Sequence, residues 1–175
     1  MSSYDVIYEY AADNYGLITS SVAKTLGIPN VELVKLAHRG KLRRLGHGVY
    51  QIFHYTPTAY DKYALAVILV GTGAMIYGES VLAMHGLALL SPASIYVAAQ
   101  NKVRKKLPSY LKIVYPEKFY DKVEYEGIPS QSVYEAFEVC RNTIMTERLV
   151  DSLEEAKRMG LITSAEATTM RAKLV

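Results

Sequence analysis

The residues with the clearest chemical signature are six Lys and Arg side chains that lie between positions 24 and 44. Only one acidic residue, Glu32, accompanies them, which gives this stretch a local charge of +5. Ammonium and guanidinium groups gathered in this way bind phosphates and displace the counterions of a nucleic acid. Residues 56–175 hold 14 basic and 13 acidic residues, so the positive charge is concentrated in the N-terminal part of the chain.

The spacing of these residues indicates an amphipathic helix within the basic stretch. In the segment VELVKLAHR, Glu32, Lys35 and Arg39 lie at i, i+3 and i+7 and share one face of a helix. Leu33 and Leu36 lie on the opposite face, which we expect to pack on neighbouring helices. A recognition helix offers such a polar face to base edges in the major groove of DNA.

The next segment, KLRRLGHGVYQIF, is typical of a β-hairpin, because Gly46 and Gly48 permit a tight turn between its apolar residues. A hairpin here places Arg43 and Arg44 on its arms and His47 at its tip. Basic groups at these positions meet phosphates or the minor groove when the hairpin lies against DNA.

A second basic run lies in the C-terminal half and is made of Lys102, Arg104, Lys105 and Lys106. It falls between two predicted strands, so one interpretation is a solvated hairpin loop. The other is a second phosphate-contacting patch that extends the DNA footprint. No residue in this segment fixes the direction of the loop, and both interpretations stay open.

Residues with catalytic potential are few and scattered. The sequence has no HExxH, CxxC, GxSxG or phosphate-binding glycine loop. Cys140, the only cysteine, lies in an apolar helical pattern and is expected to be a buried structural thiol. Glu79 and His85 are six residues apart and do not share a helix face well. We therefore expect no enzyme, no cofactor and no metal site, although carboxylates at 121, 124 and 126 keep a nuclease open as an alternative.

Three predicted helices and the hairpin make up the first 55 residues. The helices are expected at 4–13, 21–27 and 31–39, with Thr19 or Ser20 as the N-cap of the second and Asn30 as the N-cap of the third. Helix, glycine-containing turn, helix and basic hairpin form a winged helix-turn-helix, which binds DNA. The alternative is a small helical domain whose basic face contacts another protein.

The remaining residues predict a second domain, 56–175, of mixed helices and strands. Helices are expected at 58–70, 78–87, 133–142, 146–159 and from 164 onward, and strands at 74–77, 94–99, 111–115 and 122–125, with a turn at 127–129. Together with the N-terminal winged helix-turn-helix, this gives an α+β chain whose small sheet is expected to be antiparallel.

The targeting and membrane signals are negative. The first ten residues, MSSYDVIYEY, carry no basic residue and no apolar run of the signal-peptide type. The most apolar stretch, 63–78, carries no charge but falls short of the roughly 20 residues that a membrane helix needs. A protein with one cysteine and no such segment is expected in the cytoplasm, with no membrane partner.

The segments GLITSSVAKTLGIPNVELVKLAHRGKLRRLGHGVYQI and GESVLAMHGL together resemble the antitoxins of abortive-infection type IV toxin–antitoxin systems, the AbiEi-type transcriptional regulators. The similarity extends over nearly the whole chain. The winged-helix part alone is shared by many regulators, and its junction with the ES-x-L-x-x-HGL segment makes the resemblance specific. Some relatives carry a nuclease-like extension that is not seen here.

The resemblance implies two activities. The N-terminal winged helix binds double-stranded DNA at inverted repeats in its own promoter and represses the operon. The C-terminal domain counteracts a nucleotidyltransferase-like toxin, without the need for a stable complex. With the resemblance, the candidate DNA contacts are Asn30, Glu32, Lys35, His38, Arg39, Lys41, Arg43, Arg44 and His47. Glu79, Ser80, His85 and Gly86 belong to a family motif without an assigned role, and Gly86 is expected to cap a helix.

The sequence therefore predicts a DNA-binding antitoxin that represses its own operon in phage defence. The alternative is a stand-alone winged-helix transcription factor whose C-terminal domain senses a ligand or forms a dimer. A third class is an enzyme with a DNA-targeting module.

Overall fold

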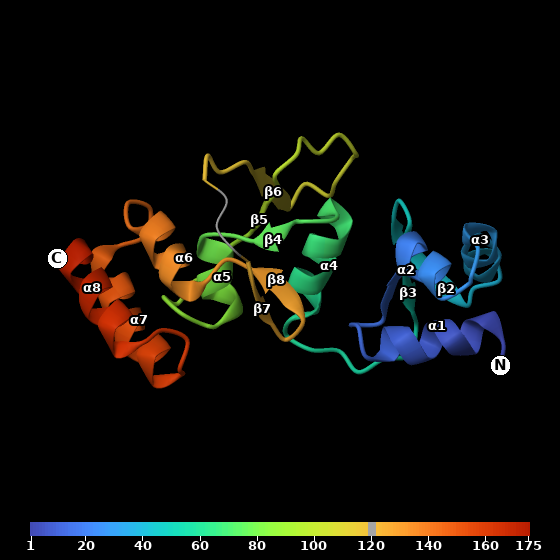
Figure 1. Ribbon diagram of the computed structural model, residues 1–175, viewed down its shortest axis with the longest axis horizontal. Coiled ribbons are helices and arrows are strands. Elements are labelled where there is room, and N and C mark those ends of the chain that lie inside the picture. The colour runs from blue at the N-terminus through green and yellow to red at the C-terminus, as the bar shows by residue number, and fades with distance from the viewer. Residues whose placement is uncertain (119–121) are drawn as a thin grey trace. The chain divides into compact units, whose positions relative to one another are not determined.

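The computed structural model describes residues 1–118 and 122–175, and it divides into two compact units, Met1–Gly71 and Thr72–Val175 (Figure 1). The chain has mixed α and β structure, as expected. Among the described residues, no helix is both long enough and apolar enough to cross a membrane. The functional boundary expected after residue 55 stays a prediction.

The first unit follows the expected order of helices and hairpin. Its elements are α1 (Ser3–Ala12), β1 (Leu17–Thr19), α2 (Ser20–Thr25), α3 (Asn30–His38), β2 (Leu42–Gly46), β3 (Val49–Ile52) and α4 (Asp61–Val70). The strands form an antiparallel sheet in the order β1-β3-β2. Ile7 of α1, Leu33 of α3 and Ile52 of β3 are fully buried and meet in one core, which fixes α3 against the sheet and the first helix.

Local signals set the ends of these helices. The Thr19 hydroxyl accepts a hydrogen bond from the Val22 amide at 3.1 Å, which confirms the predicted cap of α2. Gly27 and Gly40 have φ values of 79° and 72°, the left-handed conformation that ends α2 and α3. The prediction that Asn30 caps α3 is wrong. Pro29 holds the cap position in an extended conformation, and Asn30 is the first helical residue.

The second unit packs helices on a five-stranded sheet. Its elements are β4 (Met75–Ile76), α5 (Glu79–Met84), β5 (Ile95–Ala98), β6 (Leu111–Val114), β7 (Val123–Tyr125), β8 (Ile128–Ser130), α6 (Val133–Cys140), α7 (Thr146–Arg158) and α8 (Ser164–Leu174). The sheet order is β6-β5-β4-β8-β7. Strands β4 to β7 lie where strands were predicted, and β8 lies where a turn was predicted.

The expectation of an antiparallel sheet is wrong. Strand β5 pairs with β6 in parallel, and β4 pairs with β8 in parallel, whereas the β4–β5 and β7–β8 pairs are antiparallel. The residues from 99 to 110 therefore form a crossover between parallel strands, not a hairpin loop. The turn lies at Glu126 and Gly127, both at positive φ, which leaves Ile128–Ser130 free to pair as a strand.

The C-terminal helices match their predicted caps and faces. Leu149, Leu153 and Ala156 of α7 are fully buried, as their spacing predicts. Thr163 and Glu166 form the predicted capping box of α8, with the Thr163 hydroxyl accepting from the Glu166 amide at 3.1 Å and the Glu166 carboxylate accepting from the Thr163 amide at 2.8 Å.

Candidate nucleic-acid interface

The exposed face of α3 carries both basic and apolar side chains. Lys35 and His38 are exposed on it, and neither has a hydrogen-bond or ion-pair partner among the described residues. Val31 and Val34 lie on the same side and are 56% and 50% exposed. Sequence reasoning missed these two valines, because an apolar residue in a helix is ordinarily assigned to the core. Val34 falls between the buried Leu33 and Leu36, and Val31 lies three residues before it on the same face; this spacing was the signal that places them outside.

The buried face of α3 explains why these four side chains face solvent. Leu33 and Leu36 are buried in the core of the first unit, which leaves the positions between them toward solvent. Glu32 is half-buried at the border of the exposed face, while Arg39 is exposed just after the last helical residue. Of the predicted trio, Lys35 is thus the member exposed on the helix itself, while Glu32 lies at the border of the face and Arg39 at the end of the helix.

Asn30 is placed at the N-terminus of this face by a contact with α2. The Ser20 hydroxyl donates a hydrogen bond to the Asn30 Oδ1 at 2.8 Å. This contact orients the Asn30 amide and leaves its Nδ2 as a donor for a partner. The two helices of the candidate interface are thereby joined at the start of α3.

Arg43 and Arg44 are neighbours on β2 but occupy opposite faces of the sheet. Arg43 is paired with Gln51, and Arg44 is paired with Tyr50, whose ring is in the core beneath the helices. Because successive strand residues point to opposite faces, Arg44 lies on the side of the sheet that carries the helices, and Arg43 lies on the other side. Both side chains are exposed, and so is His47 in the turn.

A polar network holds Arg43 against its own face of the sheet. The Arg43 Nη2 donates to the Gln51 Oε1 at 2.6 Å, and the Gln51 Nε2 donates to the Tyr55 hydroxyl at 2.9 Å. The guanidinium also lies 5.8 Å from the centre of the Phe53 ring, within the range of a cation–π contact. By contrast, the Arg44 Nε makes one hydrogen bond, to the Gly46 carbonyl oxygen, at 3.3 Å.

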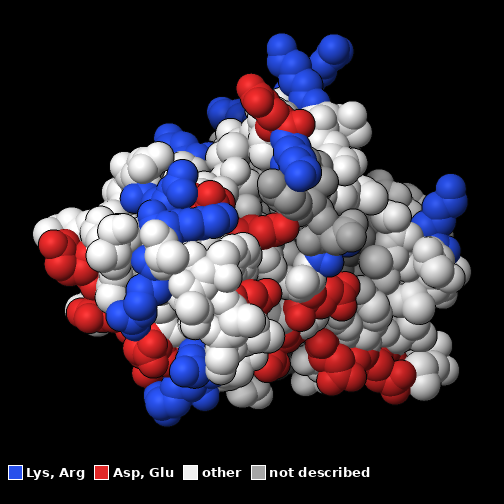
Figure 2. All heavy atoms as spheres, turned by 60° about the vertical axis from the view of Figure 1, so that its left-hand side comes forward, with Lys and Arg blue, Asp and Glu red and all other residues white. Residues whose placement is uncertain are grey.

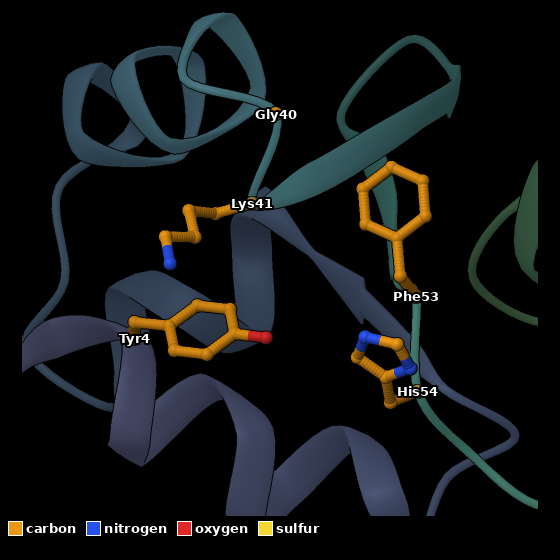
Figure 3. Close-up of a pocket in the computed structure, with 5 residues that line it drawn as sticks. All are labelled: Tyr4, Gly40, Lys41, Phe53 and His54. Carbon is orange, nitrogen blue, oxygen red and sulfur yellow. The ribbon is translucent and has the colours of Figure 1, made fainter.

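Lys41 takes part in a separate pocket. Its ammonium nitrogen lies 5.8 Å from the centre of the Tyr4 ring, and Figure 3 shows the side chain turned toward that ring. Phe53 and His54 form the facing wall of this open pocket of about 340 Å³, and Gly40 completes its lining. Lys41 is therefore directed toward α1. Of the candidate DNA-contacting residues, it is the one that lines this pocket.

The second basic run lies in the crossover from β5 to β6. Lys102, Arg104, Lys105 and Lys106 are all exposed, and none has a partner in the part of the chain that the structure describes. The Val103 amide between them donates to the Tyr115 hydroxyl at 3.0 Å, which ties the segment to the end of β6. The face drawn in Figure 2 mixes Lys and Arg with Asp and Glu and has no continuous field of one sign.

The residues with catalytic potential occupy structural positions. Cys140 is buried, and burial raises the pKa of its thiol to about 12, which keeps it protonated and unreactive. Burial lowers the pKa of His85 to about 4, and its ring packs edge-on against Tyr125 at 4.2 Å between centres. Within 1–118 and 122–175, no three His, Cys, Asp or Glu residues come together as metal ligands. Asp121, part of the nuclease alternative, lies outside the described residues.

The ES-x-L-x-x-HGL segment contributes to the architecture of the second unit. The Ser80 hydroxyl is fully buried and accepts a hydrogen bond from the Tyr96 amide of β5 at 2.8 Å. Gly86 has a φ of 71° just after the end of α5, which confirms its predicted role as a helix cap. Ser80 thus ties α5 to β5, and Gly86 ends the helix.

Comparison with known proteins bears on the N-terminal unit. The chain matches no curated protein closely enough to name a relative. One family model, described as "Transcriptional regulator, AbiEi antitoxin", matches residues 5–52. The match ends at Ile52, the last residue of β3, so the resemblance of the ESVLAMHGL segment stays a prediction. Over residues 5–52, which include every candidate contact from Asn30 to His47, the chain is thus similar to the AbiEi antitoxin family of transcriptional regulators, and the resemblance seen in the sequence is confirmed there.

Proposed function

We propose that this chain is a DNA-binding antitoxin that represses its own operon, with a winged helix-turn-helix in its first 55 residues. The observation that carries the proposal is the exposed face of α3, where Lys35 and His38 stand without partners among the described residues. Arg44 lies on the helix side of the adjoining hairpin. The match of residues 5–52 to a family of antitoxin regulators supports the same function.

In this proposal α3 enters the major groove as the recognition helix. Lys35 and His38 hydrogen-bond to base edges, while Arg39 and Arg44 bind phosphates on either side. The hairpin acts as the wing, with His47 at its tip near the backbone or the minor groove. The local charge of +5 supplies most of the affinity through the release of counterions.

The residues from 56 onward counteract the toxin, which we propose to be a nucleotidyltransferase-like protein encoded next to this chain. As in type IV toxin–antitoxin systems, the antitoxin opposes the effect of the toxin and does not need to form a stable complex with it. The crossover run at 102–106 forms a second phosphate patch, because its four cations are exposed and unpaired among the described residues.

A second candidate function is a transcription factor whose second unit senses a ligand. A pocket of about 340 Å³ in that unit favours it, and its lining combines aromatic, charged and amide side chains. These residues are Met75, Tyr77, Lys118, Gln131, Tyr134, Glu135, Glu138, Val139 and Lys173. A small molecule that binds there and changes DNA affinity would distinguish this candidate from the antitoxin.

One experiment in cells tests both halves of the proposal. The chain is expressed together with the adjacent gene, and growth is scored beside a reporter under the operon's own promoter. We expect rescue of growth and repression of the reporter from the unaltered chain, and rescue without repression from Lys35→Ala. Lys157→Ala, which removes an exposed lysine from α7, is the matched control and should retain both effects. An unaltered chain that neither rescues growth nor lowers reporter output overturns the proposal.

A further inference from the structure

We propose that α3 recognises thymine, through contacts of Val31 and Val34 with the C5-methyl groups in the major groove. This inference rests on the proposed function, since it names the bases that the same helix reads. The two valines are 56% and 50% exposed on the outer face of α3. The C5-methyl of thymine is the apolar group that a major groove presents, and small apolar side chains read it by contact.

The positions of the valines suit this role. Both lie in the N-terminal half of α3, the part of a recognition helix that approaches base edges. They are three residues apart, which separates them by about 4.5 Å along the helix axis. Neighbouring base pairs are spaced by about 3.4 Å, so the two side chains reach adjacent steps of the duplex.

The chemistry of valine adds to its suitability. A β-branched side chain in a helix is nearly confined to one χ1 rotamer, so it loses little conformational freedom when it contacts a base. The valines also stand beside Lys35 and His38, and they are not isolated apolar residues of the kind that every surface carries. Apolar contact and hydrogen-bond donors thus share one face.

The rest of the N-terminal half of α3 has few groups for hydrogen-bonded readout. Asn30 accepts from the Ser20 hydroxyl through its Oδ1, so one acceptor position of its amide is already occupied. Glu32 is half-buried at the border of the face. Lys35 then remains as the central donor, and Lys favours the O6 and N7 of guanine. We expect half-sites in which thymines flank a guanine.

The test begins with duplexes selected by the full chain from a random library. Each thymine of the selected site is replaced in turn by deoxyuridine, which lacks only the C5-methyl, and Kd is measured by fluorescence anisotropy. We expect one or two replacements per half-site to weaken binding about fourfold each, the effect of one buried methyl group. Replacements elsewhere in the site should have no effect.

Variants of the valines assign the methyl contacts to residues. The Val31→Ala and Val34→Ala proteins should each lose the methyl preference at one thymine of the half-site. At that position, the duplex with thymine and the duplex with deoxyuridine should bind the variant with equal affinity. Val123→Ala, which trims a valine on β7 that is 45% exposed, is the matched control and should keep the full difference in affinity between the thymine and deoxyuridine forms.

The outcomes separate this inference from the proposed function. A chain that selects a sequence but binds every deoxyuridine form as tightly as the thymine form overturns the thymine contact alone. The same conclusion follows if the valine variants keep the full penalty, or if they change only the oligomeric state. A chain that selects no sequence from the library overturns both the inference and the proposed function.

Discussion

Arg43 and Arg44 are consecutive residues of one strand, yet they lie on opposite faces of the N-terminal sheet. Arg44 is paired with the core residue Tyr50 and shares the side that carries α3. Arg43 is paired with Gln51 and is hydrogen-bonded to it at 2.6 Å. The two adjacent arginines of this hairpin therefore lie in two different environments, and we expect them to differ in their effect on DNA binding.

Arg44→Ala should weaken binding to all duplexes alike, because a phosphate contact carries no sequence information. The slope of log affinity against log salt should decrease by nearly one, the effect of one lost phosphate contact. Arg43→Ala should change the slope less, because Gln51 and Phe53 hold this guanidinium on the other face. Salt titrations of both variants measure the difference, and equal slopes for the two would contradict the assignment of faces.

The elements that local signals specify were predictable from the sequence. Hydroxyl caps and left-handed glycines, such as Thr19 and Gly27, act within one turn of the chain, and α2 was located from them. Strands β1 and β8 were missed, because β1 ends at Thr19, which was assigned to a helix cap, and β8 contains Pro129, which was assigned to a turn.

The parts that depend on pairing between distant segments were not predictable. The parallel pairing of β5 and β6 depends on where the crossover leads, which no strand composition encodes. The opposite placement of Arg43 and Arg44 follows from the register with β3, and the outward position of Val31 from the packing of α3. The sequence therefore predicted which residues are candidates, and the structure shows how they are oriented.

Lys35→Ala should reduce specificity as well as affinity. Lys35 is near the centre of the exposed face of α3 and has no partner among the described residues. If it reads a base, the variant loses about 1–3 kcal/mol at the selected site and much less on random DNA. Competition binding against a scrambled duplex measures this change. An equal loss on both duplexes would show that Lys35 contacts phosphate alone.

Replacement of Lys102, Arg104, Lys105 and Lys106 by Ala should preserve sequence preference and lower overall affinity. If all or most of these groups meet phosphates, the salt slope decreases by roughly two to four. Growth rescue in the co-expression assay is measured on the same variant. An unchanged slope with normal rescue would indicate a solvated loop, and an unchanged slope with lost rescue would indicate a surface that acts on the toxin.

His85 should make the second unit sensitive to acid. Burial lowers the pKa of this imidazole to about 4, against about 6.5 in an unfolded chain. Between these values the unfolded chain binds a proton that the folded chain does not, so the free energy of unfolding decreases as pH falls from about 6.5 to about 4. Urea unfolding across this range, with His85→Gln beside the unaltered chain, measures the effect. The free energy of unfolding of the variant should depend less on pH. An identical pH dependence in the two proteins would show that His85 does not cause the effect.

The affinity of the full chain for its own promoter measures the central claim most directly. Fluorescence anisotropy at physiological salt compares a duplex that contains the inverted repeat upstream of this gene with a scrambled duplex of the same length and composition. The account predicts that the promoter duplex binds at least on the order of 10³-fold more tightly. Equal affinity for the two duplexes would contradict the assignment of α3 as a recognition helix.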